Sequence, residues 1–158
     1  FSIVDMEEKD WDKVVDLNLK GVFLCCKAVI PHMRKQGKGK IVNIASLAGR
    51  SSATTVGLAY TAAKAGVLGL TRHLAKTEGS YGIRVNAVSP GSILTEHLAS
   101  RFETYPKEEQ DKRLSSTPLG RFGRPEEIAS AVLFLVSEDS SFITGANIDV
   151  NGGRCMSM

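Results

Sequence analysis

Long helical segments alternate along this chain with short apolar runs that are rich in β-branched residues. Apolar residues recur at helical spacing in three segments, 4–33, 59–82 and 124–139. Three shorter runs have the length and composition of buried strands: 40–46, 83–91 and 146–153. Strands separated by helices form right-handed crossovers, so they lie parallel in one sheet that helices cover on both faces. The sequence therefore predicts an α/β fold.

Local signals indicate where the helices begin and end. Asp5 with Glu8 has the spacing of a capping box, and Pro31 is expected to kink the last turn of the first helix or to end it. Pro125 suits the first turn of the third helix, where Glu126 complements the helix dipole. The polar segment 92–119 is expected to be irregular with short helical turns, forming a flap.

The predicted sheet is narrow, and this narrowness has a consequence. With three strands, a parallel edge strand would lack a partner although both sheet faces are buried. We therefore expect further strands before Phe1, and the start without methionine indicates a beginning cut from something longer. Residues 1–158 would then form one incomplete domain.

Charge excludes some partners. The chain has 20 basic and 17 acidic residues, a net charge of +3, and no block of like charge. A nucleic-acid or anionic-membrane partner therefore has no support. No apolar run reaches the roughly 18–20 residues of a membrane span, and no signal peptide is visible.

The spacing of cysteine and histidine residues argues against a metal site and against a disulfide between the adjacent cysteines. The cysteines are Cys25, Cys26 and Cys155, and the histidines are His32, His73 and His97. Helical neighbours point about 100° apart, so Cys25 and Cys26 are not expected to pair. The spacing of neither residue type suits a metal, so we expect no metal site and favour a reducing, cytoplasmic setting.

Tyr60 and Lys64 are the first residues that indicate chemistry. At positions i and i+4 of the second predicted helix, their side chains are neighbours. A phenol has a pKa near 10, which a neighbouring ammonium lowers because it favours phenolate. The pair suits proton exchange in an alcohol/ketone interconversion. The alternative is an ordinary exposed helix pair.

Ser46 follows directly after a predicted strand, at its carboxyl end. In open α/β sheets, ligands bind at this edge. The loop 47–59 returns the chain so that the next helix can bring Tyr60 beside Ser46, whose hydroxyl would hold a substrate oxygen. The alternative is a serine that caps a loop, a role that would suit Ser51 or Ser52 better.

An ordered set of motifs then shows a resemblance. "NLKGVF", "IVNIAS", "YTAAKAG", "RVNAVSPG", "GRFGRPEEIA" and "ITGANIDVNGG" resemble successive motifs of the classical short-chain dehydrogenase/reductase family. The resemblance covers nearly the whole chain and implies the carboxyl-terminal portion of a doubly wound Rossmann fold. Within the family, the chain looks most like 3-oxoacyl-[acyl-carrier-protein] reductases and related sugar or alcohol dehydrogenases.

The resemblance implies roles at matching positions. Tyr60 would be the general acid/base, and Lys64 would favour its phenolate and hydrogen-bond the nicotinamide ribose. Ser46 would orient the reacting oxygen; it lies 14 residues before Tyr60, where 13 is common in the family. Asn18 would anchor a water that links Lys64 to solvent, and the alternative is a structural kink beside Gly21.

The resemblance also implies a cofactor, NAD or NADP. Pro90, Gly91, Ile93 and Thr95 match the segment that closes over the nicotinamide. The Ile93 backbone would meet the carboxamide, and Thr95 would lie near it and the phosphates. A Pro-Gly stop after a strand lets backbone approach a ligand closely, although it also suits a mere turn.

One expected motif is missing. None of the 15 glycines fits G-x-x-x-G-x-G or G-x-G-x-x-G, so the turn that would hold the pyrophosphate is not in this sequence. Two hypotheses follow: part of a complete oxidoreductase, or a non-catalytic assembly or binding module. The substrate would be a small or acyl-carrier-bound alcohol or ketone.

The resemblance also suggests a lid and self-assembly. Residues 92–119 would form the substrate lid, in which Phe102 and Tyr105 pack or touch substrate. The helices at 6–33 and 59–79 match those that pack into homodimers or homotetramers in the family. Trp11, Phe23 and the small residues of 62–69 offer surface for such contacts.

Overall fold

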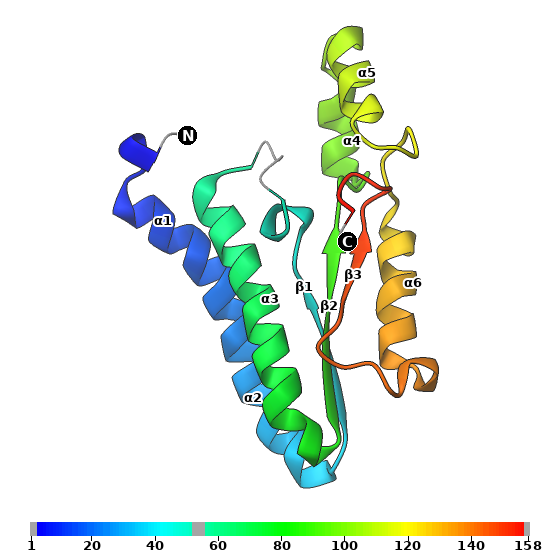
Figure 1. Ribbon diagram of the computed structural model, residues 1–158. Coiled ribbons are helices and arrows are strands. Elements are labelled where there is room, and N and C mark those ends of the chain that lie inside the picture. The colour runs from blue at the N-terminus through cyan, green and yellow to red at the C-terminus, as the bar shows by residue number, and fades with distance from the viewer. Residues whose placement is uncertain (1–2, 52–55, 157–158) are drawn as a thin grey trace.

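The computed structural model describes residues 3–51 and 56–156. Its three strands are β1 (Gly39–Ile44), β2 (Ile83–Pro90) and β3 (Asn147–Val150). All pair in parallel in the order β1-β2-β3, with Ile41 opposite Val85 and Val88 opposite Ile148. Helices lie on both sides of the sheet (Figure 1). The predicted α/β class is therefore confirmed.

The helices cover the sheet unequally. α2 and α3 lie on one face and α6 on the other, while α4 and α5 stand beyond the carboxyl ends of the strands (Figure 1). Their bounds are α1 Glu8–Val15, α2 Gly21–Gln36, α3 Leu58–Glu78, α4 Glu96–Glu103, α5 Lys107–Ser115 and α6 Pro125–Val136. A π-helical turn, Asp16–Lys20, joins α1 to α2, and 3₁₀ turns occupy Ile3–Asp5, Leu47–Gly49, Gly79–Tyr81 and Glu138–Ser140. Within the described residues, no helix is long and apolar enough to cross a membrane.

One prediction about helix ends was wrong. Asp5 and Glu8 form no capping box, because the chain makes a 3₁₀ turn first and α1 begins after Glu7 without a side-chain cap. Of the two alternatives for Pro31, the end of the helix is excluded, because α2 continues past it to Gln36 and stops at the left-handed Gly37. The predicted start of the third helix is confirmed, with Pro125 in its first turn.

The segment predicted to be irregular is largely helical. It contains both α4 and α5, separated by a short turn. Thr95 caps α4, because its Oγ1 accepts a hydrogen bond from the Leu98 N–H at 3.3 Å. Few apolar residues occur in α5, so the sequence offered weak periodicity from which to predict it.

The central strand β2 is buried along almost its whole length. Ile83 and Val85 pack against α2 and α3 through Cys26 and Ala75. Ala87 continues the same face toward Val67. Burial on both faces is the usual environment of a central parallel strand and explains its continuous apolar run.

Polar side chains on the opposite face of β2 hold the chain between α6 and β3. Asn86, fully buried, donates from Nδ2 to the Ile143 carbonyl at 2.9 Å and accepts from the Ala146 N–H at 3.0 Å. Arg84 donates to the Leu135 and Ser137 carbonyls at the end of α6. These bonds tie β2 to the end of α6 and to the connection before β3, and the one from Asn86 supplies the acceptor of the Ala146 N–H.

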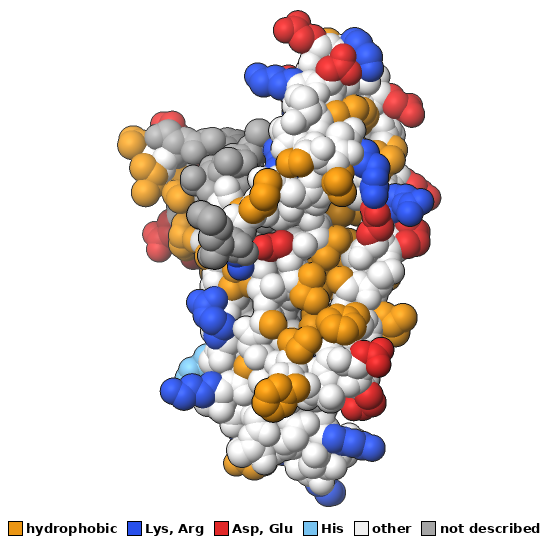
Figure 2. Space-filling view, turned by 45° about the vertical axis from the view of Figure 1, so that its right-hand side comes forward, with side chains coloured by type: hydrophobic (Ala, Val, Ile, Leu, Met, Phe, Trp, Pro, Cys, Tyr) orange, Lys and Arg blue, Asp and Glu red, His pale blue; other side chains and the backbone are white. Residues whose placement is uncertain are grey.

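The side that carries α6 is only partly covered. Figure 2 brings this side forward and shows hydrophobic side chains gathered along it. Large exposed apolar residues from its elements are Ile44 of β1, Leu133 and Phe134 of α6, and Phe142. Beside them, the outer edge of β1 pairs with no strand of the described residues.

Asn86→Ala should lower the free energy of unfolding by about 1–3 kcal/mol, because it leaves the Ala146 N–H without its partner and leaves the Ile143 carbonyl with Arg84 as its only donor. Urea unfolding of the purified protein measures this loss. Arg72→Ala, on the exposed side of α3, is the control and should change the value by less than about 0.5 kcal/mol. Equal effects of the two substitutions would contradict the assigned role of Asn86.

Candidate functional site

The turn after β1 is pressed against α3, the helix that carries Tyr60 and Lys64. At Gly49 in this turn, a Cβ atom would lie 2.6 Å from the Lys64 carbonyl carbon and 2.7 Å from the Ala65 nitrogen. Only glycine permits such a close approach between two backbones. The fold therefore brings Ser46, three residues before Gly49, to the helix of Tyr60 and Lys64.

Ser46 has a structural role in addition to the one predicted. Its Oγ accepts a hydrogen bond from the Ala48 N–H at 3.1 Å and so caps the turn. The alternative of a serine that caps a loop therefore holds for Ser46 itself, whereas Ser52 lies outside the described residues. A hydroxyl can accept and donate at once, and the Ser46 O–H has no acceptor among the described residues. That donor remains available to a ligand.

Tyr60 and Lys64 are neighbours on α3, as their spacing predicts. The Lys64 Nζ lies 5.6 Å from the centre of the Tyr60 ring, and it donates to the Ile44 carbonyl at the end of β1, at 2.9 Å. Burial lowers the pKa of the half-buried Lys64 ammonium. An ammonium carries three donors, so two are left for a ligand or water. The Tyr60 hydroxyl has no hydrogen-bond partner among the described residues.

Asn18 lies inside the π-helical turn that joins α1 to α2. Its Nδ2 donates to the Val14 carbonyl, one turn earlier, at 3.0 Å. The helix is thus irregular at this asparagine, as the structural alternative predicted. A π turn leaves a carbonyl without its usual helical partner. This turn packs against α3, where a Cβ at Gly66 would lie 2.8 Å from the Leu19 side chain.

The chain after β2 passes close to the end of β3. A Cβ at Gly91 would lie 2.9 Å from the Asn151 Cα, and the Gly91 N–H donates to the Val150 carbonyl at 2.9 Å. Two residues on, the Ile93 carbonyl accepts from the Thr95 N–H at 2.9 Å, whereas the Ile93 N–H has no partner in the described part of the chain. Pro90, the last residue of β2, precedes this segment.

A small cavity of about 100 Å³ opens beside Ser46. Pro90, Gly91 and Ser92 line it together with Arg154. Tyr60 and Lys64 do not line this cavity. The structure thus gathers Ser46 with the segment after β2, and it joins Ser46 to α3 through the turn at Gly49.

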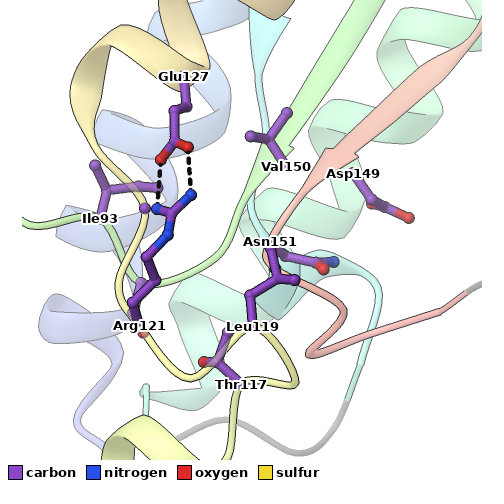
Figure 3. Close-up of a pocket in the computed structure, with 11 residues that line it drawn as sticks. Ile93, Thr117, Leu119, Arg121, Glu127, Asp149, Val150 and Asn151 are labelled. Atoms are coloured by element: carbon purple, nitrogen blue, oxygen red, sulfur yellow. Dashed lines mark hydrogen bonds and ion pairs between the residues drawn. The ribbon is translucent and has the colours of Figure 1, made fainter.

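A larger cavity of about 220 Å³ is lined in part by Ile93, in the segment after β2 (Figure 3). Arg121 and Glu127 face one another inside it, at 2.7 and 2.9 Å. The Arg121 guanidinium, together with the Arg124 N–H, lowers the pKa of Glu127 to about 2. Because these charges satisfy each other, we assign the cavity a structural role in supporting Ile93, which pairs with Gly123.

Sequence reasoning missed Arg154 and Ser92. The Arg154 Nη1 donates to the Ser92 Oγ at 2.8 Å beside the Ser46 cavity. One signal was available: Arg154 follows a predicted strand, at the same sheet edge as Ser46 and Pro90.

Comparisons with known proteins agree with this geometry. The family model described as Enoyl-(Acyl carrier protein) reductase matches residues 2–154. The chain is 46% identical to the 3-oxoacyl-[acyl-carrier-protein] reductase of Thermotoga maritima over 154 residues, which covers 96% of this chain and 59% of that protein.

Two solved structures are similar in fold as well. The 3-oxoacyl-[acyl-carrier protein] reductase of Brucella melitensis has a TM-score of 0.91 at 39% identity, over 98% of this chain and 56% of that one. A putative gluconate dehydrogenase of Agrobacterium tumefaciens has a TM-score of 0.91 at 34% identity, over 100% of this chain and 61% of that one. The chain thus spans about three fifths of each protein it matches.

Gly49→Ala should destabilise the protein by about 1–3 kcal/mol, because its Cβ would meet backbone atoms of α3 that cannot move aside cheaply. Gly69→Ala is the matched control on α3, since a Cβ there meets nothing within 4 Å. The control should stabilise the helix by about 0.4–1 kcal/mol. Thermal unfolding of both variants checks the difference, and a neutral Gly49→Ala would show that the two backbones are not in tight contact.

Proposed function

Because the chain belongs to the short-chain dehydrogenase/reductase family, we propose that it carries the proton-transfer part of an NAD(P)-dependent oxidoreductase. The reaction is the interconversion of a secondary alcohol and a ketone. The observation that carries this proposal is the meeting of Ser46 with the helix of Tyr60 and Lys64, each with donors that the described residues leave unused.

Each of the three side chains has a distinct task in the proposed reaction. In reduction, the Tyr60 hydroxyl gives its proton to the substrate oxygen, and in oxidation its phenolate takes that proton back. The Ser46 O–H donates to the same oxygen and fixes its position. Lys64, held by the Ile44 carbonyl, places positive charge beside the Tyr60 ring.

The residues present fit the nicotinamide end of the cofactor. Lys64 has unused N–H groups for a ribose hydroxyl, and the open Ile93 N–H suits the carboxamide oxygen. Gly91 lets backbone lie close, and Thr95 caps the helix that follows. When bound, the cofactor exchanges a hydride with the carbon that bears the oxygen. The missing glycine-rich turn means that the pyrophosphate would be held by residues outside this sequence.

Asn18 serves this site through water in our proposal. One of its two amide hydrogens is used by Val14, and its π turn lies against α3. A water held at this irregular turn would connect the Lys64 ammonium to solvent and renew the proton on Tyr60.

For the substrate, a 3-oxoacyl thioester is our first choice, because two of the similar proteins are 3-oxoacyl-[acyl-carrier-protein] reductases. A sugar or simple alcohol is the second, favoured by the likeness to a putative gluconate dehydrogenase. In either case α4 and α5 would serve as the lid. Exposed Phe23, Leu24 and Val29 on α2 would support assembly into a homodimer or homotetramer.

The mass of the purified polypeptide and a cofactor assay together separate catalysis from a non-catalytic module. We expect a polypeptide longer than 158 residues that oxidises NADH or NADPH with an acetoacetyl thioester or a simple ketone. A polypeptide of 158 residues that folds and turns over none of these would instead support the binding module.

Tyr60→Phe should lower kcat by about 10²–10⁴-fold, because it removes the group that exchanges the proton. The cofactor dissociation constant should stay nearly the same, since the ring and Lys64 remain. Steady-state kinetics with a parallel fluorescence titration of NADPH measure the two quantities. Substantial turnover by this variant would contradict the assigned role of Tyr60.

Ser46→Ala should remove both the cap and the catalytic donor. We expect a stability loss of about 0.5–2 kcal/mol and a fall in kcat of about 10²-fold or more. Ser137→Ala is the matched control, because the Ser137 Oγ caps a 3₁₀ turn in the same way, accepting from the Asp139 N–H at 3.2 Å. The control should lose similar stability and keep its turnover. Equal turnover in the two variants would contradict the catalytic role of Ser46 and leave it only the role of a cap.

A further inference from the structure

Arg154 carries a positive charge that no acidic side chain of the described residues pairs with. It follows β3 after a reversal in which Gly152 and Gly153 have positive φ, 64° and 85°. Its guanidinium donates to the Ser92 hydroxyl at 2.8 Å, and it forms no ion pair with the described residues. The side chain is only partly exposed. A partly buried guanidinium that has no carboxylate partner keeps N–H groups with which it can bind an anion.

Two cavities meet at Arg154. One is the small cavity beside Ser46, and the other, of about 240 Å³, lies under α4 and α5. Ser92 and Arg154 line both. The cavity beside Ser46 and the cavity under α4 and α5 are therefore neighbours that share these two residues.

We call this second space the cationic cavity, because its charged lining residues are Lys112, Arg113, Arg154 and a single carboxylate, Glu109. Arg113 binds that carboxylate at 2.9 Å and lies over the Tyr105 ring. Lys112 has no acidic partner among the described residues. The cavity thus has two cations without an acidic partner among the described residues: Lys112 on α5, and Arg154 after β3.

The uncharged lining of the cationic cavity combines three apolar side chains with the two serines Ser92 and Ser116. Leu98 and Phe102 of α4 face it together with Phe122, and the two aromatic rings pack edge to face at 4.8 Å. An apolar wall that ends at two cations suits a molecule with a hydrocarbon arm and a terminal anion.

We propose that the cationic cavity binds an anionic group on the substrate, a carboxylate, phosphate or sulfonate, through Arg154 and Lys112. The substrate would then be an alcohol or ketone joined by a short apolar arm to this anion. This statement rests on the proposed function for the reacting end and on the cavity for the charged end. Arg154 is a specificity-determining residue, and Ser92 holds its guanidinium in place.

A binding measurement tests the cavity without any turnover. Isothermal titration of the purified protein compares 1-propanesulfonate with the neutral methyl propyl sulfone. We expect the sulfonate alone to bind, and Arg154→Ala to weaken it about 10- to 100-fold. Arg154→Lys should retain part of the affinity. Lys107→Gln is the matched control on α5, since Lys107 is exposed and pairs with Asp111 outside the cavity.

Three results would overturn the proposal: no binding of the sulfonate, equal binding of sulfonate and sulfone, or equal losses in Arg154→Ala and Lys107→Gln. Each would mean that the cations are merely solvated. A loss of sulfonate affinity in Arg154→Ala and Lys112→Gln, with Lys107→Gln unchanged, would support the proposal.

A substrate series tests the link to the reaction. 4-Oxopentanoate, 5-oxohexanoate and 6-oxoheptanoate place a carboxylate at increasing distance from the ketone, and their methyl esters are neutral. We expect one acid to exceed its ester in kcat/KM by about 10-fold or more, Arg154→Ala to abolish that preference, and Lys107→Gln to keep it. Turnover of every ester with no preferred acid would overturn the inference and leave the proposed function standing. Sulfonate binding through Arg154 with no turnover of any ketone would support the anion site and contradict the proposed function.

Discussion

The contact between two backbones at Gly49 is the constraint on which the site depends. The turn after β1 and the helix α3 approach so closely that any side chain there would overlap main-chain atoms of Lys64 and Ala65. This contact fixes the position of a loop residue, Ser46, relative to a helix. A loop residue needs such a rigid reference, because loops otherwise vary more than the elements that they connect. At Gly66 the same helix lies close to the π turn, but there the contact is with the side chain of Leu19.

The sheet supplies the second requirement, a common edge. Ser46, the segment after Pro90 and Arg154 follow three adjacent parallel strands, so all of them emerge on one side of the sheet. The buried polar contacts of Asn86 keep β3 in register with β2 through the connection that precedes it. Charges and donors collected at one edge in this way can act on a single ligand.

Much of this arrangement could be predicted from the sequence, because periodicity and strand order are local or nearly local properties. The Tyr60 and Lys64 pair follows from helical geometry, and the position of Ser46 follows from the end of an apolar run. The double role of Ser46 could not be predicted, since a cap depends on the geometry of the turn that follows. The π turn at Asn18 has no sequence pattern of its own, and α5 has few apolar residues to reveal it. Arg154 escaped notice because its meaning comes from two cavities formed by distant segments.

The outer edge of β1 and the apolar side chains beside it have a practical consequence. A strand edge that no described strand covers offers a row of backbone donors and acceptors to any extended chain. The exposed apolar side chains of Ile44, Phe134 and Phe142 lie near this edge. A recombinant product confined to these 158 residues would accordingly tend to precipitate or to capture foreign peptides. Co-expression with a polypeptide that can pair with the outer edge of β1 should reduce this tendency. The gain in soluble yield would measure how strongly solubility depends on covering that edge.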